Sequence, residues 1–587
     1  MRELTIYRRR ETLNKMTQEL DLRNVYGSTI KRIAAQDGGK WRLGMAALMW
    51  ISYAERPLRV DELCHALAVE LGSTDFNAGN VPSISTVVGC CQGLISVDEE
   101  TSTVRLINLT LQEYLFSSPG IFLVCEPRFC EPHSEMAEIC LTYLKSNRVK
   151  ALVVSASPDA GGAPFLEYCS VYWGVHAKKG PSDYTTPLAL DLFQEYDGHI
   201  SPKLLFKQVE HLDDLDTHFS AGFQFTGLHC ASFFGIGEVV AALLEMKYYD
   251  VNARDFVGYT PLAWAALNGH AEVLRMLLGH GEVKPYTPDN HGRTPLSHAA
   301  CNGNVAAVKM LLRRDVTPDK PDNGGRTPLS LAAEGGHDEV VKLLLGLQAV
   351  SLDKPDNHGY IPLSHSAWNG NEGVVKILLG REEVDPENQD DEGRTSLSYA
   401  AGKGHQGVVK ILLGREEIHS DMPDNAGRTP LSHAAGNGHE EVVEMLLDRA
   451  EVYSEMPDDA GRTPLSYAAG KGHEEAVRIL LGRPEVNPDR LDNTGKTSLS
   501  HAAKNGHAGV VKMLLSRKEV TSNRPDHFGR TPLMLAEMYS HKAVVEVLKL
   551  HEFAEVHSGR GSSSGNICRV GTTHCQLGKA RRTQPGG

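Results

Sequence analysis

Residues 427–439 read GRTPLSHAAGNGH, and apolar side chains follow at Val442, Val443, Leu446 and Leu447. Variants of this segment occur ten times in the chain. Its threonine position falls at 226, 260, 294, 327, 361, 395, 429, 463, 497 and 531, so the step is 34 residues eight times and 33 once. A fixed period in this range is typical of a solenoid that stacks one supersecondary unit on the next. Such an array offers a long binding surface and has no obvious reaction centre.

Each repeat contains the signals for two short helices and a turn. Thr429 can cap the first helix with its hydroxyl, and Pro430 suits the first helical position. Gly438 can end that helix in a left-handed conformation. The apolar positions at 442, 443, 446 and 447 lie on one face of a second helix. Proline, aspartate and glycine in residues 451–461 then predict an extended finger with a tight turn.

This unit resembles the ankyrin repeat over residues 226–552, and the resemblance implies a scaffold for binding other proteins. The histidine that usually follows T-P-L is kept only at His229, and most other copies have serine there. The finger carries an extra proline, such as Pro355. Ile361 replaces the capping threonine in the fifth copy, and Ser540 replaces the helix-ending glycine in the last. End repeats are expected to deviate because they cap the stack.

The region before the array has the order of a winged-helix domain. Apolar helices are predicted from Leu43, at 60–67 and at 84–92, followed by a hairpin at 94–107. Residues 50–67 read WISYAERPLRVDELCHAL, which resembles the winged-helix domain that follows the NACHT module in fungal NOD-like receptors. The resemblance implies a signalling protein with effector and nucleotide-binding parts absent, since no G-x-x-x-x-G-K-[ST] loop is present.

We therefore predict a mainly α protein with five parts. These are a remnant tail of a NACHT-like module at 1–37, a winged-helix α+β domain at 40–120, a helical linker at 121–225, an α-solenoid of about ten ankyrin repeats at 226–552 and a disordered tail at 553–587. The linker is expected to dock on the first repeat.

Composition excludes several classes of function. The net charge is −14 and the sequence pI is about 6.0, whereas nucleic-acid binding needs a basic face. The candidate recognition helix at 84–92 has no Lys or Arg, so we expect no DNA contact. The 11 cysteines form no C-x-x-C pair, which favours a reduced compartment. No apolar stretch is long enough to span a bilayer, and we predict a cytoplasmic protein.

The array does not predict catalysis, a metal site or a cofactor. Ser432 and His433 are neighbours on a helix, so they cannot face each other. The histidines at 298, 365, 433 and 501 recur in alternate copies, about 20 Å apart at a helix spacing of about 10 Å. Zinc needs ligands at about 2 Å. A second histidine column, at 270, 337, 405, 439, 473 and 507, is expected to tie its own turn by a local hydrogen bond.

Positions that vary within an otherwise uniform repeat are candidates for partner recognition. We predict a protein-binding concave face centred on repeats two to eight, because aromatic residues and arginine are enriched at interface centres. Two alternatives stay open: the column after T-P-L-x could fill space between repeats, and the arginines could pair with finger acids. The candidate residues are Trp264, His298, His365, Tyr399, Arg428, His433, Arg462, Tyr467 and His501.

Two classes of function fit this surface. The first is a non-enzymatic sensor or adaptor resembling the recognition half of a fungal NOD-like receptor. The second is a regulatory or inhibitory subunit that binds an enzyme or a full-length receptor, so related receptor chains are among the expected partners. Neither class requires nucleic acid or a membrane.

Overall fold

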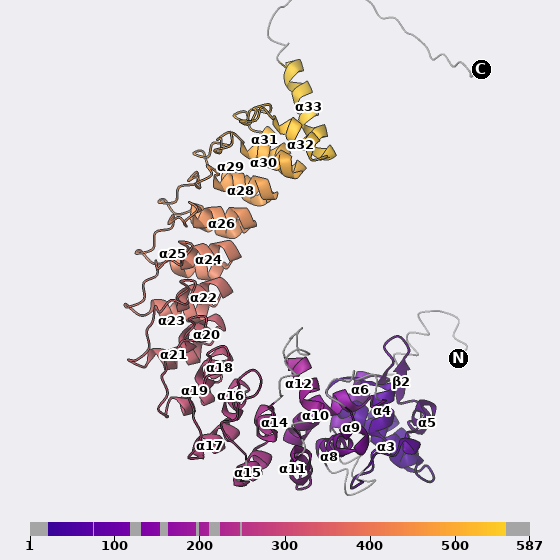
Figure 1. Ribbon diagram of the computed structural model, residues 1–587. Coiled ribbons are helices and arrows are strands. Elements are labelled where there is room, and N and C mark those ends of the chain that lie inside the picture. The colour runs from indigo at the N-terminus through magenta and orange to yellow at the C-terminus, as the bar shows by residue number, and fades with distance from the viewer. Residues whose placement is uncertain are drawn as a thin grey trace, which may run out of the picture. The chain divides into compact units, whose positions relative to one another are not determined.

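The computed structural model describes residues 22–73, 75–117, 131–152, 162–194, 196, 199–209, 224–246 and 249–558. They fall into two compact units, one ending at Asp390 and one beginning at Asp391. The described chain is mainly helical with one small sheet, which confirms the predicted fold class (Figure 1). The predicted remnant at 1–37 is described only from Leu22, where a helix begins.

The first unit opens with a small α+β domain. Its sheet has the order β1-β3-β2, with both pairs antiparallel. Two residues form β1, because Leu58 and Arg59 pair with Val104 and Thr103 in the second strand of the predicted hairpin. The elements are α2 (Leu22–Ala34), α3 (Lys40–Tyr53), β1 (Leu58–Arg59), α4 (Val60–Ala66), η1 (Ala78–Asn80), α5 (Ile84–Cys90), β2 (Ile95–Asp98), β3 (Thr103–Leu106) and α6 (Leu109–Ser117).

A helical segment follows and packs on the first repeat. Its elements are α8 (Pro132–Lys145), α9 (Asn147–Lys150), α10 (Leu166–Lys179), α11 (Thr185–Phe193) and α12 (Ser201–Val209). Trp173 on α10 is fully buried, and its ring lies edge-on to Phe234, with centroids 5.4 Å apart. Gly174 allows this approach, because a Cβ there would lie 2.2 Å from the Phe234 ring. The expected docking of this segment is therefore present.

The first five repeats belong to the first unit, and each contributes two short helices. Their first helices pack against one another, as do their second helices. The pairs are α14 (Gly227–Phe234) and α15 (Gly237–Glu245), α16 (Pro261–Leu267) and α17 (Ala271–Gly279), α18 (Pro295–Cys301) and α19 (Val305–Leu311), α20 (Pro328–Glu334) and α21 (Asp338–Leu345), and α22 (Pro362–Asn369) and α23 (Glu372–Leu379).

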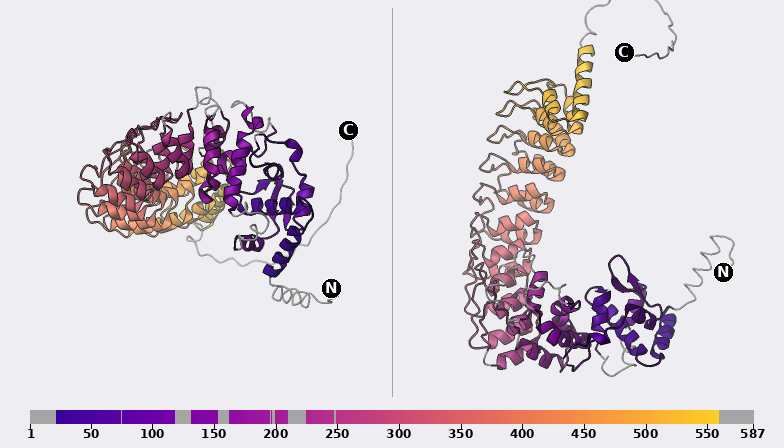
Figure 2. Two further views of the ribbon diagram at one scale, coloured as in Figure 1. Left: turned by 90° about the horizontal axis from the view of Figure 1, so that it is seen from below. Right: turned by 45° about the vertical axis from the view of Figure 1, so that its right-hand side comes forward.

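The second unit holds repeats six to ten in the same arrangement. Figures 1 and 2 show its first helices stacked side by side, with the fingers projecting away from them. The pairs are α24 (Ser396–Lys403) and α25 (Gln406–Leu413), α26 (Pro430–Asn437) and α27 (Glu440–Leu447), α28 (Pro464–Lys471) and α29 (Glu474–Leu481), α30 (Ser498–Asn505) and α31 (Ala508–Leu515), and α32 (Pro532–Met538) and α33 (Lys542–Ser558).

Local sequence explains how each first helix begins and ends. The Thr429 hydroxyl accepts a hydrogen bond from the Ser432 amide, and Pro430 occupies the first turn. Gly438 ends the helix with φ +75°. Ile361 is fully buried at the capping position of the fifth repeat, and no side chain caps that helix. The sequence therefore located both the helix boundaries and the weak copy.

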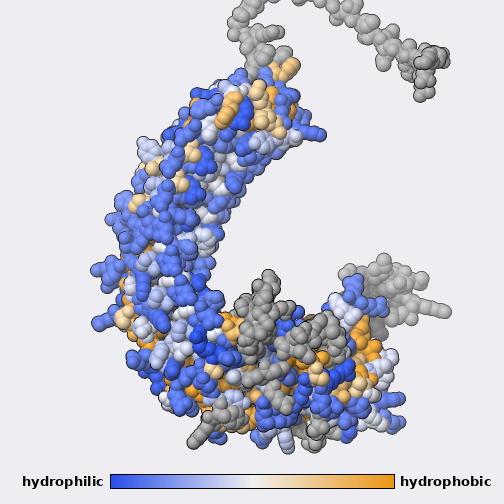
Figure 3. Space-filling model, in the orientation of Figure 1, coloured by the Kyte–Doolittle hydropathy of each residue, from blue (hydrophilic) through white to orange (hydrophobic). Residues whose placement is uncertain are grey.

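The last repeat differs from the expected end of the array. Helix α33 continues to Ser558, six residues beyond the predicted end at 552, so residues 553–558 are helical; the rest of the predicted tail lies outside the described residues. Exposed apolar side chains gather on this repeat, as the orange area around α32 and α33 shows (Figure 3). They are Met534, Met538, Tyr539, Leu550 and Phe553.

Replacing Ser540 with glycine should stabilise the last repeat by about 0.5–1 kcal/mol. Ser540 has φ +61°, a left-handed conformation that costs a residue with a side chain about 1–2 kcal/mol. Glycine removes this cost, but part of the gain is lost because glycine has more conformational entropy in the unfolded chain. Urea denaturation of the full chain measures the change. Ser516→Gly is the control, because Ser516 has φ −71° at a helix end. Equal effects of the two substitutions would contradict a conformational origin.

Candidate partner-binding surface

A buried aspartate organises the finger turn of nearly every repeat. In the seventh repeat, Asp424 Oδ1 accepts hydrogen bonds from the amides of Ala426 at 3.0 Å and Arg428 at 2.9 Å. Asp424 is only 5% exposed. We call the equivalent residues turn aspartates; those whose amide bonds are described are Asp255, Asp289, Asp322, Asp356, Asp424, Asp458, Asp492 and Asp526.

For six of the eight turn aspartates, the second carboxylate oxygen binds a side chain nine residues later, on the first helix; Asp322 and Asp526 have a leucine there. Asp424 Oδ2 lies 3.0 Å from His433 Nε2, and Asp458 Oδ2 accepts the Tyr467 hydroxyl at 2.6 Å. Trp264 donates its indole N–H to Asp255 at 2.8 Å. The same link joins His298 to Asp289, His365 to Asp356 and His501 to Asp492.

An arginine four residues after the turn aspartate completes the cluster. Arg428 Nε and Nη2 lie 2.9 and 2.8 Å from Asp424 Oδ2, and Arg462 binds Asp458 in the same way. The Arg462 guanidinium also lies over the Tyr467 ring, 4.7 Å from its centroid. Both candidate arginines, Arg428 and Arg462, therefore pair with acidic residues of the fingers, which was one of the two alternatives left open by the sequence.

Burial divides the nine predicted contact residues. Trp264 and His298 are each 1% exposed and Tyr399 is 4% exposed, so these side chains offer almost no surface to a partner and we leave them out of the proposed surface. The other four ring residues, His365, His433, Tyr467 and His501, are partly buried beside their aspartates. The Arg428 and Arg462 side chains keep 34% and 41% of their surface exposed.

Neighbouring repeats bring these columns together in the second unit. Gly402, near the end of α24, lies against His433 and Asn437 of the next repeat, since a Cβ there would be in ordinary contact with both. Asn437 Nδ2 also donates to the Gly402 carbonyl at 2.7 Å. The ring column and the residues near the ends of the first helices therefore form one continuous edge.

Three lysines lie near the ends of first helices on the same edge. Lys403 and Lys471 are exposed and are the last residues of α24 and α28. Lys504 of α30 is partly exposed, and its ammonium lies 5.6 Å from the centroid of the Tyr539 ring of the next repeat. Together with the arginines they make a positively charged surface on a protein whose net charge is −14. We call this set the cationic edge: Lys403, Arg428, Arg462, Lys471 and Lys504.

The histidine at the start of the second helix joins repeats and does not tie its own turn. His439 Nε2 lies 3.1 Å from the carbonyl oxygen of Gly402, 37 residues earlier, and His473 and His507 make the same contact with Gly436 and Gly470. The prediction of a local hydrogen bond was wrong in this respect. The 34-residue stacking places the preceding helix end, rather than the histidine's own turn, beside the ring.

The Ser–His neighbours do not form a nucleophile and base. Ser432 Oγ lies 3.2 Å from Thr429 Oγ1, within the helix cap, while His433 points to Asp424. A Ser–His pair needs a direct hydrogen bond between the two side chains. In the seventh repeat, Ser432 and His433 therefore make contacts that hold the repeat together.

The charge environment differs between the turn aspartates. Burial by itself raises the pKa of Asp424, but hydrogen bonds from the Arg428 amide and guanidinium outweigh burial and hold the pKa below its usual value. Asp255 has no such arginine. Burial raises the pKa of Asp255 to about 6, although the Trp264 indole N–H and nearby amides oppose this shift.

These opposite shifts predict opposite pH dependence. Asp424 has a lowered folded-state pKa, so its contribution to stability is complete above the unfolded value of about 4 and is lost as pH falls through the folded value. Asp255 has a raised pKa, so relative to Asp255→Asn the natural chain should gain about 1–3 kcal/mol as pH falls from about 6 to 4. Urea denaturation at several pH values measures both differences. The same sign for Asp255→Asn and Asp424→Asn would contradict this assignment.

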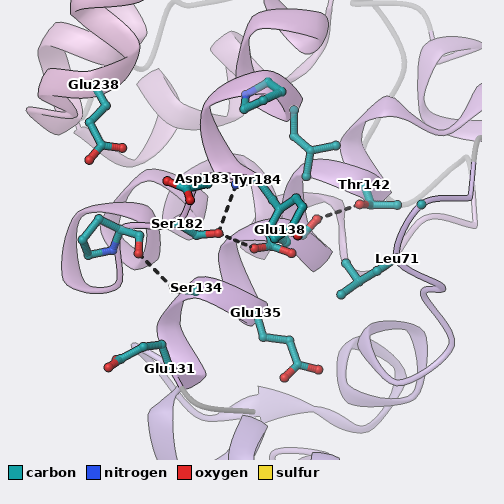
Figure 4. Close-up of a pocket in the computed structure, with 14 residues that line it drawn as sticks. Leu71, Glu131, Ser134, Glu135, Glu138, Thr142, Ser182, Asp183, Tyr184 and Glu238 are labelled. Atoms are coloured by element: carbon teal, nitrogen blue, oxygen red, sulfur yellow. Dashed lines mark hydrogen bonds between the residues drawn. The ribbon is translucent and has the colours of Figure 1, made fainter. Parts of the chain in front are cut away.

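An acidic cavity of about 960 Å³ lies in the first unit. Its lining includes Glu131, Glu135, Glu138, Asp183 and Glu238, and Figure 4 shows Glu138 beside Ser182 and Tyr184. Ser182 donates a hydrogen bond to Glu138 at 2.7 Å. The residues that line the cavity include no Lys, Arg or His.

Comparison with known families agrees with this architecture. The profile described as ankyrin repeats matches overlapping segments from residue 200 to residue 524, which is more than half of the chain. The chain therefore belongs to the ankyrin-repeat family. A second profile, described as the winged helix domain of GPI inositol-deacylase, matches residues 30–121. No curated protein matches the chain.

These matches confirm the predicted ankyrin repeats and winged helix. Ankyrin repeats indicate a scaffold for protein–protein interaction, and the profiles matched include no catalytic domain, although the winged helix is named after an enzyme. In the described part of the chain, no helix combines the length and apolar character needed to cross a membrane.

The constant nine-residue step from turn aspartate to ring residue was missed in the sequence. It is visible there as Asp255 to Trp264, Asp424 to His433 and Asp458 to Tyr467.

Proposed function

We propose that the chain is a non-catalytic recognition scaffold and that the cationic edge of its second unit binds an acidic surface of a protein partner. The observation that carries the proposal is the fixed placement of exposed cations along one edge of uniform repeats. The turn aspartates hold Arg428 and Arg462 in place, and rings anchored on the same aspartates lie beside them. Little side-chain entropy remains to be lost when these anchored groups bind.

The partner is expected to be negatively charged where it meets this edge. Asp424 and Asp458 are buried beside Arg428 and Arg462, so the outer surface presents guanidinium groups at these two repeats. Complementary charge raises association rates and makes them sensitive to salt. The edge therefore favours a partner with clustered Asp and Glu side chains.

Charge reversal at three lysines tests the proposal without breaking the anchored clusters. Lys403→Glu, Lys471→Glu and Lys504→Glu combined should weaken partner binding at least about tenfold, mainly through slower association. The matched control is Lys410→Glu with Lys512→Glu, which are exposed lysines on the second helices α25 and α31. Partners captured with the full chain are compared across both variants, and rate constants are measured at low and high salt.

A partner held equally well by the triple variant and by the control would contradict the cationic edge. The triple variant should unfold at the same urea concentration as the control, which separates lost binding from lost folding. Replacing Tyr399, Arg428 and Tyr467 is a poorer test, because Tyr399 is buried and the other two bind turn aspartates.

We also propose that this scaffold is the sensor or adaptor part of a receptor of the fungal NOD-like type, acting in the cytoplasm. The support is the likeness of residues 50–67 to the winged-helix domain of such receptors, together with a winged helix that precedes ankyrin repeats. Mapping of the full transcript tests this. An in-frame phosphate-binding loop encoded before Met1 is expected, and a complete transcript without one would contradict the proposal.

A further inference from the structure

Three potential metal ligands meet where the winged-helix domain contacts the helical segment of the first unit. Glu55 follows α3, His133 lies in the first turn of α8, and His176 lies near the end of α10. One ligand atom from each residue lies within 4.8 Å of the other two. Within the described ranges, this is the one group of three such residues that brings ligand atoms so close together.

Hydrogen bonds orient both imidazoles toward a common point. The Nδ1 atoms of His133 and His176 lie 2.8 Å apart, so one ring donates and the other accepts. The Nε2 atom of His176 lies 2.8 Å from the Tyr168 hydroxyl, which also accepts the Glu55 amide at 3.1 Å. A histidine that binds a metal typically has its other nitrogen held in this way. Tyr168 therefore fixes the ring that presents Nδ1.

We propose that Glu55, His133 and His176 bind a divalent transition-metal ion of the zinc class. Two imidazole nitrogens and one carboxylate oxygen are ligands that zinc accepts, with water in a fourth position. The ion replaces the proton shared by the two Nδ1 atoms. The ring that held this proton at Nδ1 takes the tautomer protonated at Nε2, so each imidazole keeps one N–H. Mg²⁺ and Ca²⁺ prefer oxygen ligands, so they should not compete.

Lys179 competes with the ion for Glu55. Its ammonium lies 2.6 and 2.8 Å from the two carboxylate oxygens of Glu55. The Lys179 side chain is 47% exposed, so it can turn outward into solvent when a cation arrives. The Lys179 ammonium therefore occupies the place beside Glu55 that the metal ion would take. Removing the Lys179 charge should strengthen metal binding.

The sequence-based expectation of no metal site concerned the histidines of the array. The cluster lies before the array. Glu55 and His133 are 78 positions apart, and His133 and His176 are 43 positions apart, so no short sequence motif indicates the site. An ion there would connect α3 of the winged-helix domain to α8 and α10. It would therefore stabilise the packing between two parts of the first unit.

Titration of the full chain with ZnCl2 after chelator treatment tests the proposal. One equivalent should bind with a dissociation constant of about 1 µM or below and should raise the thermal midpoint. Co²⁺ should give visible absorption typical of mixed nitrogen and oxygen ligands. His133→Gln and Glu55→Gln should each weaken binding at least about tenfold. Lys179→Met should strengthen it.

The control is His65→Gln, a half-buried histidine of the same domain whose ring stacks on Phe76. It should leave zinc affinity unchanged. Circular dichroism of each variant separates lost binding from lost folding, and Lys179→Met gives an effect of opposite sign that misfolding cannot produce. Absence of stoichiometric binding by the natural chain, or binding unaffected by His133→Gln, would overturn the proposal.

Discussion

Asp424→Ala should lower the free energy of unfolding of the second unit by about 3 kcal/mol. The substitution removes the acceptor of two backbone amides and leaves Arg428 and His433 without their shared carboxylate. Removing one partner of a buried ion pair costs about 3–5 kcal/mol. The lower end applies here, because the Arg428 side chain is 34% exposed and can turn to water.

Asp459→Ala is the matched control for Asp424→Ala. Asp459 is the neighbour of a turn aspartate but its residue is exposed, so the loss should be within about 0.5 kcal/mol. Asp424→Asn should fall between the two, since it keeps the oxygen for the amides but places an amide group against Arg428. Urea denaturation followed by circular dichroism measures the three variants. Similar losses for Asp424→Ala and Asp459→Ala would show that the cluster does not stabilise the repeat.

Trp264→Ala should lower the free energy of unfolding of the first unit by about 3–5 kcal/mol. The side chain is 1% exposed, and its ring lies 4.7 Å from Tyr259 and 5.2 Å from Phe233, measured between centroids. Truncating a buried tryptophan leaves a large cavity and costs about this much. The indole also donates to Asp255, and its loss leaves that carboxylate with fewer hydrogen bonds.

Two further variants locate the origin of the Trp264 effect. Tyr286→Ala, at a finger residue that is 52% exposed, should change stability by less than about 0.5 kcal/mol. Trp264→Phe keeps a ring and loses the N–H, so it should cost less than Trp264→Ala. If Trp264→Ala left the unfolding midpoint unchanged and abolished partner capture, the residue would be a contact residue and the packing role would be wrong.

The sequence predicted the repeated unit well because its signals are local. A capping threonine, a proline in the first turn and a glycine that tolerates positive φ act within a few residues of one another. Ile361 and Ser540 could therefore be identified as weak points before their surroundings were known. The two-residue strand at Leu58 and Arg59 was missed, because it exists only through its pairing with Val104 and Thr103.

Long-range contacts decided the roles of the variable residues. Trp264 and His433 occupy the same column, yet one is buried among aromatic rings and the other is partly exposed beside Arg428. His439 reaches a carbonyl 37 residues away, which its own turn does not predict. Burial depends on what the neighbouring repeats and the helical segment place around each position, and no single repeat contains that information.

The sequence by itself determined the period, the two helices of each repeat and the class of protein, since these depend on residues that are close together in the chain. Only the tertiary structure decided which side chains remain on the surface, how each turn aspartate joins an arginine and a ring, and that Glu55, His133 and His176 meet. Those contacts join positions that become neighbours only when the helices pack, because packing fixes distances that the order of residues leaves open.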